Sequence, residues 1–468
     1  MKVLLATPPL HPYQSYNFKF PQFPIFNLTL LAALIRDRHE VRVINHAAAI
    51  DRPHLVLEIA DEFQPDVVGF AVPSPVSALR LADAIADLKK RHPRVHVALG
   101  GPFPTVEPRY CLERLGADAA FIGEADAAFP RWLDDPDAAS APGVLTRNNV
   151  GGDSEPVWND DLDALPPPAW DLLPYHPEIY TGRRAAAVEM SRGCPYECEF
   201  CTVHRVGPTY REKSPVAMLA ELARLWADGV RELLFVDNSF ALNEGAVDEL
   251  VEGMLSHGWR FEFGAYFRAD TIAAHPEMIR RLAQAGLRYA IVGFESYSDS
   301  ALATMRKGAP AERNRQAADI LRDAGVRSIG SHIFGTPNES PFEMLRSFAH
   351  GTRDSDVFKA GLFTPLPGSR LHERLAAEGR LAETDPLAMD YRHYRVGGRL
   401  RRLGIPALTM VLLGGYYLSP WRLVRWPFLD TWSRMLHRVE YRALLGRLRA
   451  EWQMRGRSAH QGGGRGDA

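Results

Sequence analysis

Cysteine is scarce in this sequence. The 468 residues contain four cysteines, and three of them, Cys194, Cys198 and Cys201, lie within one short segment. The fourth, Cys111, stands alone, and a single thiolate cannot hold an iron–sulfur cluster. The chain therefore cannot supply a second thiolate-bound cluster of its own.

No charge of either sign dominates the sequence. The chain has 55 Lys and Arg residues against 57 Asp and Glu residues, a net charge of -2. This balance gives no electrostatic reason to expect nucleic acid as a partner. A composition that is 46% hydrophobic and 24% charged is typical of a soluble globular protein, and the length predicts two or three domains.

Long hydrophobic runs are also missing. The N-terminal run Met1–Ala6 is too short for a signal peptide and resembles a first strand, so we expect a cytoplasmic protein. The run Ile405–Leu418 is too short and too broken to span a bilayer. It is flanked by arginines, and we expect a buried helix that caps the domain before it. Two alternatives stay open: a helix on the surface of the inner membrane, and a cover over an apolar substrate cavity.

The first 140 residues alternate between strand-like and helical patterns, which predicts a parallel, doubly wound sheet of the Rossmann or flavodoxin-like type. Ligands of such sheets bind beyond the carboxyl ends of the strands. We therefore expect one rim of cofactor-binding turns there, with Pro8, Ser74, Gly100, Gly101 and Glu124 as candidate residues. The predicted strands are Lys2–Ala6, Glu40–Asn45, Asp66–Val72 and Val95–Gly100, and the helices between them are Leu28–Arg36 and Ala78–Lys90.

Residues 141–180 are rich in Pro, Gly, Asn and Asp and are predicted to form a linker. Strands and helices alternate again over residues 181–385, which predicts a partial barrel of six parallel strands with functional residues at their carboxyl ends. Residues 386–455 are predicted to be helical, and residues 456–468 to be a disordered tail. The predicted barrel strands are Ala185–Met190, Glu232–Val236, Arg260–Tyr266, Tyr289–Phe294, Arg327–Phe334 and Val357–Thr364.

The three clustered cysteines carry most of the chemical information. Three thiolates at the spacing Cys-x3-Cys-x2-Cys can ligate three irons of a cubane cluster and leave the fourth iron open to a substrate or cofactor. This pattern favours catalysis over electron storage. The alternative is a zinc site with His204 as the fourth ligand, but no second pair of ligands follows Cys201 and a buried strand precedes the loop.

The cysteine loop resembles that of the radical S-adenosylmethionine (SAM) enzymes. Together with the two β/α regions, it makes the chain similar to the radical SAM enzymes that carry a cobalamin-binding domain, over about Met1–Leu375. That group includes methyltransferases and the anaerobic magnesium-protoporphyrin monomethyl ester cyclase. The resemblance implies a [4Fe-4S] cluster held by Cys194, Cys198 and Cys201, together with SAM and cobalamin as cofactors. With no second cluster, subfamilies that carry auxiliary clusters, such as the methylthiotransferases, are excluded.

The resemblance also implies contacts to SAM. Phe200 would lie near the adenine, although a core aromatic is equally plausible. Asp237 stands where many relatives have a Gly-Gly-Glu that binds the SAM amino group, and its alternative role is a helix cap. Arg268, with Asp270, would lie near the SAM carboxylate, unless the two form an ordinary ion pair at a strand end.

Further candidates lie on the later strands. Glu295, in a segment with Ser296, is expected to accept hydrogen bonds from the SAM ribose, and Gly335 belongs to a glycine segment that approaches the adenine. His332 is more often a core residue than a general base in such a position. No catalytic residue is assigned.

The residues after the first strand, Thr7–Pro12, lack the Asp-x-His-x-x-Gly motif that supplies a cobalt ligand in many cobalamin proteins, so histidine ligation of cobalt is not predicted. The leading functional hypothesis is methylation of an unactivated carbon in a hydrophobic or natural-product small molecule, by way of a 5′-deoxyadenosyl radical and methylcobalamin. Radical oxidative cyclisation is the second hypothesis, and a zinc-stabilised cobalamin or nucleotide sensor is the third. An electron donor such as flavodoxin or ferredoxin is the expected protein partner.

Overall fold

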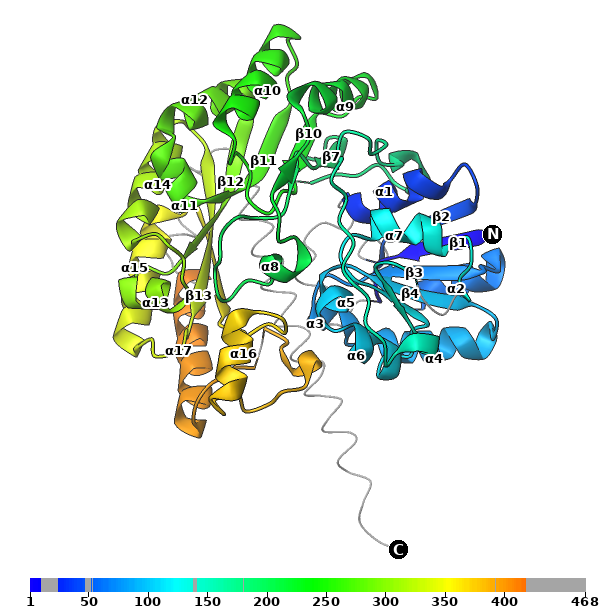
Figure 1. The fold of residues 1–468 in the computed structure, drawn as a ribbon. Coiled ribbons are helices and arrows are strands. Elements are labelled where there is room, and N and C mark those ends of the chain that lie inside the picture. Colours follow the sequence, from blue (N-terminus) through cyan, green and yellow to red (C-terminus); the bar gives the residue numbers. More distant parts are fainter. Residues whose placement is uncertain are drawn as a thin grey trace, which may run out of the picture.

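The computed structural model describes residues 1–9, 24–46, 52, 54–137, 141–179, 181–391 and 393–417. It has two lobes, each built around a parallel sheet (Figure 1). The N-terminal lobe, blue to cyan, lies at one side of the larger green and yellow lobe. The α/β fold class with two sheet domains is therefore confirmed.

The N-terminal sheet has six strands in the order β2-β1-β3-β4-β5-β6. The first five run parallel, and β6 pairs antiparallel with β5. This is the flavodoxin-like order, in which the direction of winding reverses between β1 and β3 and leaves a ligand crevice at that point. The strands are β1 (Lys2–Ala6), β2 (Glu40–Ile44), β3 (Val67–Ala71), β4 (His96–Gly100), β5 (Ala119–Phe121) and β6 (Val144–Thr146).

Two apolar clusters cover the two faces of this sheet. Helices α2, α4 and α6 pack on one face, and α1 and α7 pack on the other. The strand β3 is buried along its whole length because both of its faces are covered. The helices are α1 (Phe26–Ile35), α2 (Leu55–Phe63), α3 (Pro75–Ala78), α4 (Leu81–Arg91), α5 (Pro102–Val106), α6 (Pro108–Glu113) and α7 (Ala125–Trp132).

The second sheet has six parallel strands in the order β14-β13-β12-β11-β10-β7. Among the described strands, β7 and β14 do not pair with each other, so the sheet is an open partial barrel, as the sequence predicted. Its strands are β7 (Ala185–Val188), β10 (Glu232–Phe235), β11 (Glu262–Arg268), β12 (Leu287–Glu295), β13 (Arg327–Phe334) and β14 (Val357–Leu362).

Helices surround this barrel, and several of them have an N-terminus capped by a side chain. Side chains of Ser214, Asn243 and Ser298 each accept a hydrogen bond from the first turn of the helix that follows, and Ser340 forms a capping box with Glu343. The helices are α9 (Pro215–Ala227), α10 (Glu244–Ser256), α11 (Ala269–Ala274), α12 (Pro276–Ala285), α13 (Asp299–Thr304), α14 (Ala311–Asp323), α15 (Pro341–Asp354) and α16 (Arg370–Ala377).

The segment predicted as a linker is partly built into the first lobe. The strand β6 extends the N-terminal sheet, and Val157 forms a further bridge with Gly123. The sequence missed β6 because this stretch is rich in turn-forming residues. The other domain bounds stay predictions.

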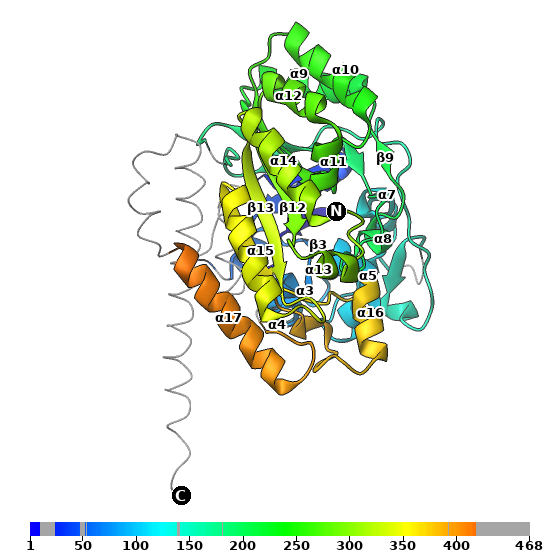
Figure 2. The ribbon, with the colours of Figure 1, turned by 90° about the vertical axis from the view of Figure 1, so that its left-hand side faces the viewer.

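Beyond the barrel, α17 (Arg399–Tyr417) runs along the outside of α15 (Figure 2). It contains the run Ile405–Leu418 up to Tyr417. Before it, the described residues of 386–398 hold only a short 3-10 helix, Pro386–Ala388, so the predicted helical region starts later than expected. Residues 418–455 of that region and the predicted tail lie outside the described residues. No helix in the described part of the chain is both long enough and apolar enough to cross a bilayer.

Candidate active site between the two lobes

The cysteine loop begins where the barrel meets the N-terminal lobe. It leaves the short strand β8 (Ser191–Arg192) and ends at α8 (Val203–Val206), and β8 pairs with β9 (Arg211–Glu212). Gly193 opens the loop with a φ of 79°, and a Cβ at that position would lie 2.1 Å from the carbonyl oxygen of Thr209. Only glycine fits there. As a result the loop lies between the barrel and α5 of the first lobe (Figure 1).

The three thiols lie within electrostatic range of one another. Cys198 is buried, and the amide of Cys201 donates a 3.1 Å hydrogen bond to the carbonyl oxygen of Cys198. Burial raises the pKa of Cys194, and it raises that of Cys201 to about 11, so bound iron has to compensate the thiolate charges. In a cubane each cysteine ligates a different iron, so three thiols spread over one loop fit this group.

The zinc alternative finds no support in this geometry. The Nδ1 of His204 lies 3.0 Å from the backbone oxygen of Cys201, so this nitrogen caps the loop. Within the described ranges, no group of three or more His, Cys, Asp and Glu side chains is arranged to hold a single metal ion.

Arg268, at the end of β11, contacts the cysteine loop directly. One of its NH groups donates a 3.3 Å hydrogen bond to the Sγ of Cys198, and two others pair with Asp270. The guanidinium also lies 3.6 Å from the centre of the Tyr196 ring. Arg268 therefore belongs to the site. The ion pair with Asp270, which the sequence analysis gave as the alternative to a SAM contact, holds it in place. Sequence reasoning missed Tyr196, because nothing in the motif distinguishes it from a surface residue.

Asp237 holds the residues that lead into the cysteine loop. Its oxygens accept hydrogen bonds from the amide of Met190 at 3.2 Å and from the amide and hydroxyl of Ser191 at 2.6 Å. Burial raises its pKa to about 7. It does not cap the next helix, since Asn243 does that. Contact with the SAM amino group stays a prediction.

Glu295 ends β12 in a left-handed conformation, with a φ of 60°. Its carboxylate is buried and accepts a 3.0 Å hydrogen bond from the Nζ of Lys307. A non-glycine residue with positive φ stores strain, which is typical of functional sites. Glu295 also lies within electrostatic range of Cys201, so it belongs to the loop's surroundings, and its contact with the SAM ribose stays a prediction.

Three other predicted residues lie within packed regions. The hydroxyl of Ser296 is buried against that of Ser347 at 2.9 Å, behind the strand end. Phe200 packs between the barrel core and the cluster under α17. Gly335 lies under Tyr394 and Ile405, where a Cβ would come within 2.5 Å of Ile405. These contacts favour structural roles for the three residues, and their contacts to SAM stay predictions.

His332 is a core residue. It is 3% exposed, stacks on Phe358 with ring centres 4.5 Å apart, and has its Nε2 3.3 Å from the Ser355 hydroxyl. Burial lowers its pKa to about 3. It therefore stays neutral and has no role as a base.

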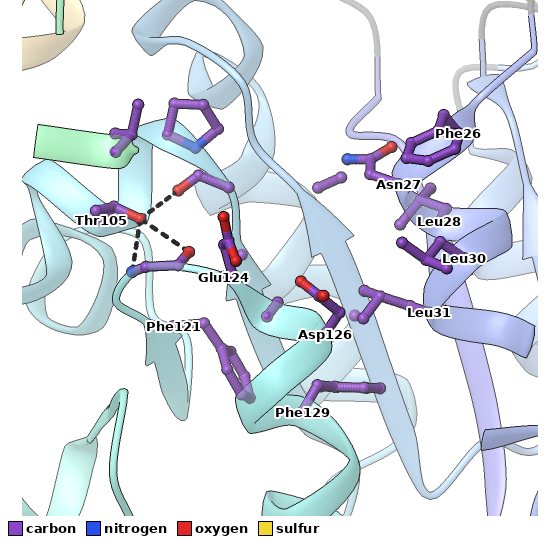
Figure 3. Close-up of a pocket in the computed structure, with 18 of the residues that line it drawn as sticks. Phe26, Asn27, Leu28, Leu30, Leu31, Thr105, Phe121, Glu124, Asp126 and Phe129 are labelled. Carbon is purple, nitrogen blue, oxygen red and sulfur yellow. Dashed lines mark hydrogen bonds between the residues drawn. The ribbon is translucent and has the colours of Figure 1, made fainter. Parts of the chain in front are cut away.

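A cavity of about 270 Å³ lies at the carboxyl edge of the N-terminal sheet, and we call it the junction cavity. Apolar side chains of α1 and α7 form its walls, while Glu124 and Asp126 point into it from the start of α7 (Figure 3). From the barrel lobe it is lined by Glu189, Arg192 and Gly193. The cavity therefore reaches from the first lobe to the residue before Cys194.

The predicted rim is only partly in this cavity. Gly100, Gly101 and Glu124 line it, whereas Pro8 and Ser74 are not among its lining residues. Ser74 instead precedes α3, with its hydroxyl 3.1 Å from that of Ser77. The rim itself is held by Thr105, whose hydroxyl donates to the carbonyl oxygen of Gly101 and accepts from the amide of Gly123 (Figure 3).

Comparisons with known proteins agree with this geometry. The model of the radical SAM superfamily matches residues 188–349, and the model of the B12 binding domain matches residues 22–133. The first match spans the cysteine loop and most of the barrel. The second covers most of the N-terminal sheet and its side of the junction cavity.

Curated relatives cover most of the chain. An uncharacterised methyltransferase of Pyrococcus horikoshii is 27% identical, over 84% of this chain and 86% of its own. The hopanoid C-3 methylase of Methylococcus capsulatus is 25% identical over 76% of this chain and 69% of its own. The anaerobic magnesium-protoporphyrin IX monomethyl ester cyclase of Synechocystis is 21% identical over 91% of this chain and 84% of its own.

Solved structures share the two-lobed fold. The cobalamin-dependent SAM radical enzyme OxsB, solved with aqua-cobalamin and SAM, superimposes with a TM-score of 0.73 at 17% identity, covering 96% of this chain and 72% of its own. The radical SAM methyltransferase TsrM of Kitasatospora setae gives a TM-score of 0.67 at 16% identity, covering 96% of this chain and 99% of its own. This chain therefore contains a B12 binding domain followed by a domain of the radical SAM superfamily, and its cofactors are a [4Fe-4S] cluster, SAM and cobalamin.

Proposed function

We propose that this enzyme methylates an unactivated carbon of a hydrophobic or natural-product small molecule. The observation that carries the proposal is the junction cavity, because residues of the cobalamin-binding lobe and the residues just before Cys194 line the same space. Two cofactors that share one cavity can act on one substrate without a diffusing intermediate. Relatives named as hopanoid C-3 and C-2 methylases support a hydrophobic substrate.

When bound, the cluster supplies the electron that cleaves SAM to a 5′-deoxyadenosyl radical, and cobalamin supplies the methyl group. The residues of the chain bind and orient these groups. Arg268 places a fixed positive charge beside Cys198, and Glu295 places a buried carboxylate near Cys201. Asp237 fixes the strand that leads into the loop. Gly100 and Gly101 form the part of the rim that lines the junction cavity.

A test of this function uses anaerobically reconstituted enzyme, a strong reductant and SAM with a labelled methyl group. We expect 5′-deoxyadenosine to form, and label to enter the product when a hydrophobic candidate substrate is added. The variant Cys198→Ala should lose iron and all cleavage of SAM. Its matched control is Cys111→Ser, since Cys111 is a buried thiol in the other lobe and should leave the iron content unchanged.

The second candidate function is oxidative cyclisation, which the relatives named as magnesium-protoporphyrin cyclases support. It predicts conversion of the substrate with no label in the product. A converted but unlabelled substrate would therefore refute methyl transfer.

We also propose that an acidic flavodoxin or ferredoxin reduces the cluster. Arg306, Arg370 and Arg374 are each partly exposed around Glu197 and Glu199 of the cysteine loop. Such a surface favours an acidic partner. Formation of 5′-deoxyadenosine should then fall steeply with added salt when flavodoxin is the reductant, and little when dithionite is. Equal salt dependence with both reductants would refute this docking.

Finally, we propose that α17 associates with an anionic membrane surface. Leu400, Leu403, Met410 and Val411 are each at least 60% exposed and recur at helical spacing along one side of it. Arg399 lies at the start of α17, and the sequence that follows Tyr417 is rich in Arg and Trp. The enzyme should float with vesicles that contain phosphatidylglycerol, and Leu400→Glu with Leu403→Glu should abolish this. An unchanged flotation of the double variant would refute the proposal.

A further inference from the structure

A group of five charged side chains joins the two lobes beside the junction cavity. Its members are Glu124 and Asp126 of the N-terminal lobe and Glu189, Arg192 and Arg211 of the barrel lobe, and we call it the junction ion cluster. The side chain of each is 16% exposed or less. Charges buried to this degree contribute only when geometry and partners are good, so their arrangement is specific.

Arg192 is the centre of this cluster. Its Nε lies 2.6 Å from Glu189, and one NH group lies 2.9 Å from Asp126 and 3.2 Å from Glu124. Its planar guanidinium therefore binds carboxylates of both lobes at once through separate nitrogens in a fixed geometry, which the single nitrogen of a lysine cannot reproduce. Arg211 pairs with the other oxygen of Glu124 at 2.7 Å, so that carboxylate stays compensated without Arg192.

The same residues have two further contacts. Glu124, Asp126, Glu189 and Arg192 all line the junction cavity, so a cofactor in that cavity meets their side chains. Arg192 is also followed in the chain by Gly193 and Cys194, and Gly193 has a φ of 79°, a conformation in which a Cβ would clash with Thr209. Arg192 therefore lies two residues before the first predicted cluster ligand, so its position bears on where the loop starts.

We propose that Arg192 is a positioning residue that couples cobalamin binding to the iron–sulfur loop. An occupied junction cavity holds Asp126 and Glu189 against the guanidinium, and this fixes Cys194. Cobalamin should then raise the affinity of the loop for its iron–sulfur cluster. By thermodynamic linkage, the bound cluster must raise the affinity for cobalamin by the same factor. The inference rests on the proposed place of cobalamin in this cavity.

The test is the affinity for hydroxocobalamin, titrated by absorbance under anaerobic conditions, in full-length protein with and without its iron–sulfur cluster. We expect the wild type to bind about tenfold more tightly when the cluster is present, within the usual range of coupling. In Arg192→Lys and in Asp126→Asn the ratio should fall to about one, with iron content retained. The change in the electron paramagnetic resonance signal of the reduced cluster on cobalamin addition should disappear in the same variants.

The matched control is Arg36→Lys. Arg36 pairs with Asp171 at 2.7 Å and also joins the first lobe to the segment between the lobes, but it lies away from the cavity and the loop. It should keep the wild-type ratio. Equal wild-type affinities with and without the cluster, or an unchanged ratio in Arg192→Lys, would overturn the inference. Failure to bind cobalamin at all would instead contradict the cofactor assignment.

Discussion

At the scale of single residues, the site is made of side chains whose contacts lie far away in the sequence. Arg268 and Cys198 are 70 residues apart, and Arg192 and Asp126 are 66 residues apart. The three cysteines could be singled out as predicted cluster ligands because one loop carries all three. The partners of Arg268 and Arg192 could not, since only the packing of strands and lobes brings them together.

Replacement of Arg268 should slow the reductive cleavage of SAM. Arg268→Gln removes a charged hydrogen bond to Cys198, and bonds of this kind contribute about 1.5 to 3 kcal/mol, so we expect a rate lower by about tenfold to a hundredfold. The measurement is the rate of 5′-deoxyadenosine formation per bound iron. Arg288→Gln is the control, because Arg288 pairs with Glu262 at 3.8 Å at the start of the barrel strands. A full rate in Arg268→Gln would show that the contact is incidental.

His332 should make the protein sensitive to acid. Burial lowers its pKa to about 3, whereas the unfolded chain has the ordinary value of 6.5. The stabilisation from the neutral form is therefore complete above pH 6.5 and is lost as the pH falls toward 3, by about 1.4 kcal/mol per pH unit. His332→Leu cannot take up a proton, so its thermal midpoint should fall less between pH 6.5 and 4.5 than that of the wild type. Burial also lowers the pKa of His46, to about 4, but His46 is present in both proteins and does not contribute to the difference between them. Parallel curves for the two proteins would therefore contradict this prediction.

At the scale of elements, periodicity was enough for most of the fold. The strands Lys2–Ala6 and Arg327–Phe334 have the bounds that the sequence predicted. The strands β5 and β6 were not among the predictions because each has three residues, too few to show a period. Their pairing is set by distant parts of the sheet.

The turn at Gly193 should be as important as the cysteines. Gly193→Ala places a methyl group against Thr209 and forces a left-handed conformation on alanine, so we expect iron content to fall by more than half. Gly229→Ala is the matched control, with a φ of 80° and open space around its Cβ. It should lose about 1 kcal/mol of stability and no iron. Equal iron content in both variants would show that the loop tolerates the clash.

At the scale of the whole molecule, both lobes are needed for the junction cavity, and α1 forms one of its walls on the first lobe (Figure 3). Leu31 lines the cavity from that helix and is only half-buried, so it can be replaced without loss of the fold. Leu31→Trp should fill the space and weaken cobalamin binding at least tenfold, while Leu31→Ala should bind within a few-fold of the wild type.

The measurement is the thermal stabilisation by hydroxocobalamin. At a hundredfold excess over the dissociation constant, the wild type should gain about 2.7 kcal/mol, and Leu31→Trp should gain little at the same concentration. Equal stabilisation of Leu31→Trp and Leu31→Ala by hydroxocobalamin would place cobalamin elsewhere.

The open edge of the barrel has a consequence for how the enzyme can be divided. In the part of the chain that the structure describes, β7 pairs with β10 on one side and with no barrel strand on the other, and Phe26 and Leu30 of α1 pack beside Ala187. A truncated barrel would present this bare edge to solvent, and bare edges recruit other chains into aggregates. The two halves therefore depend on each other for solubility as well as chemistry, and a gene split between them would yield insoluble material.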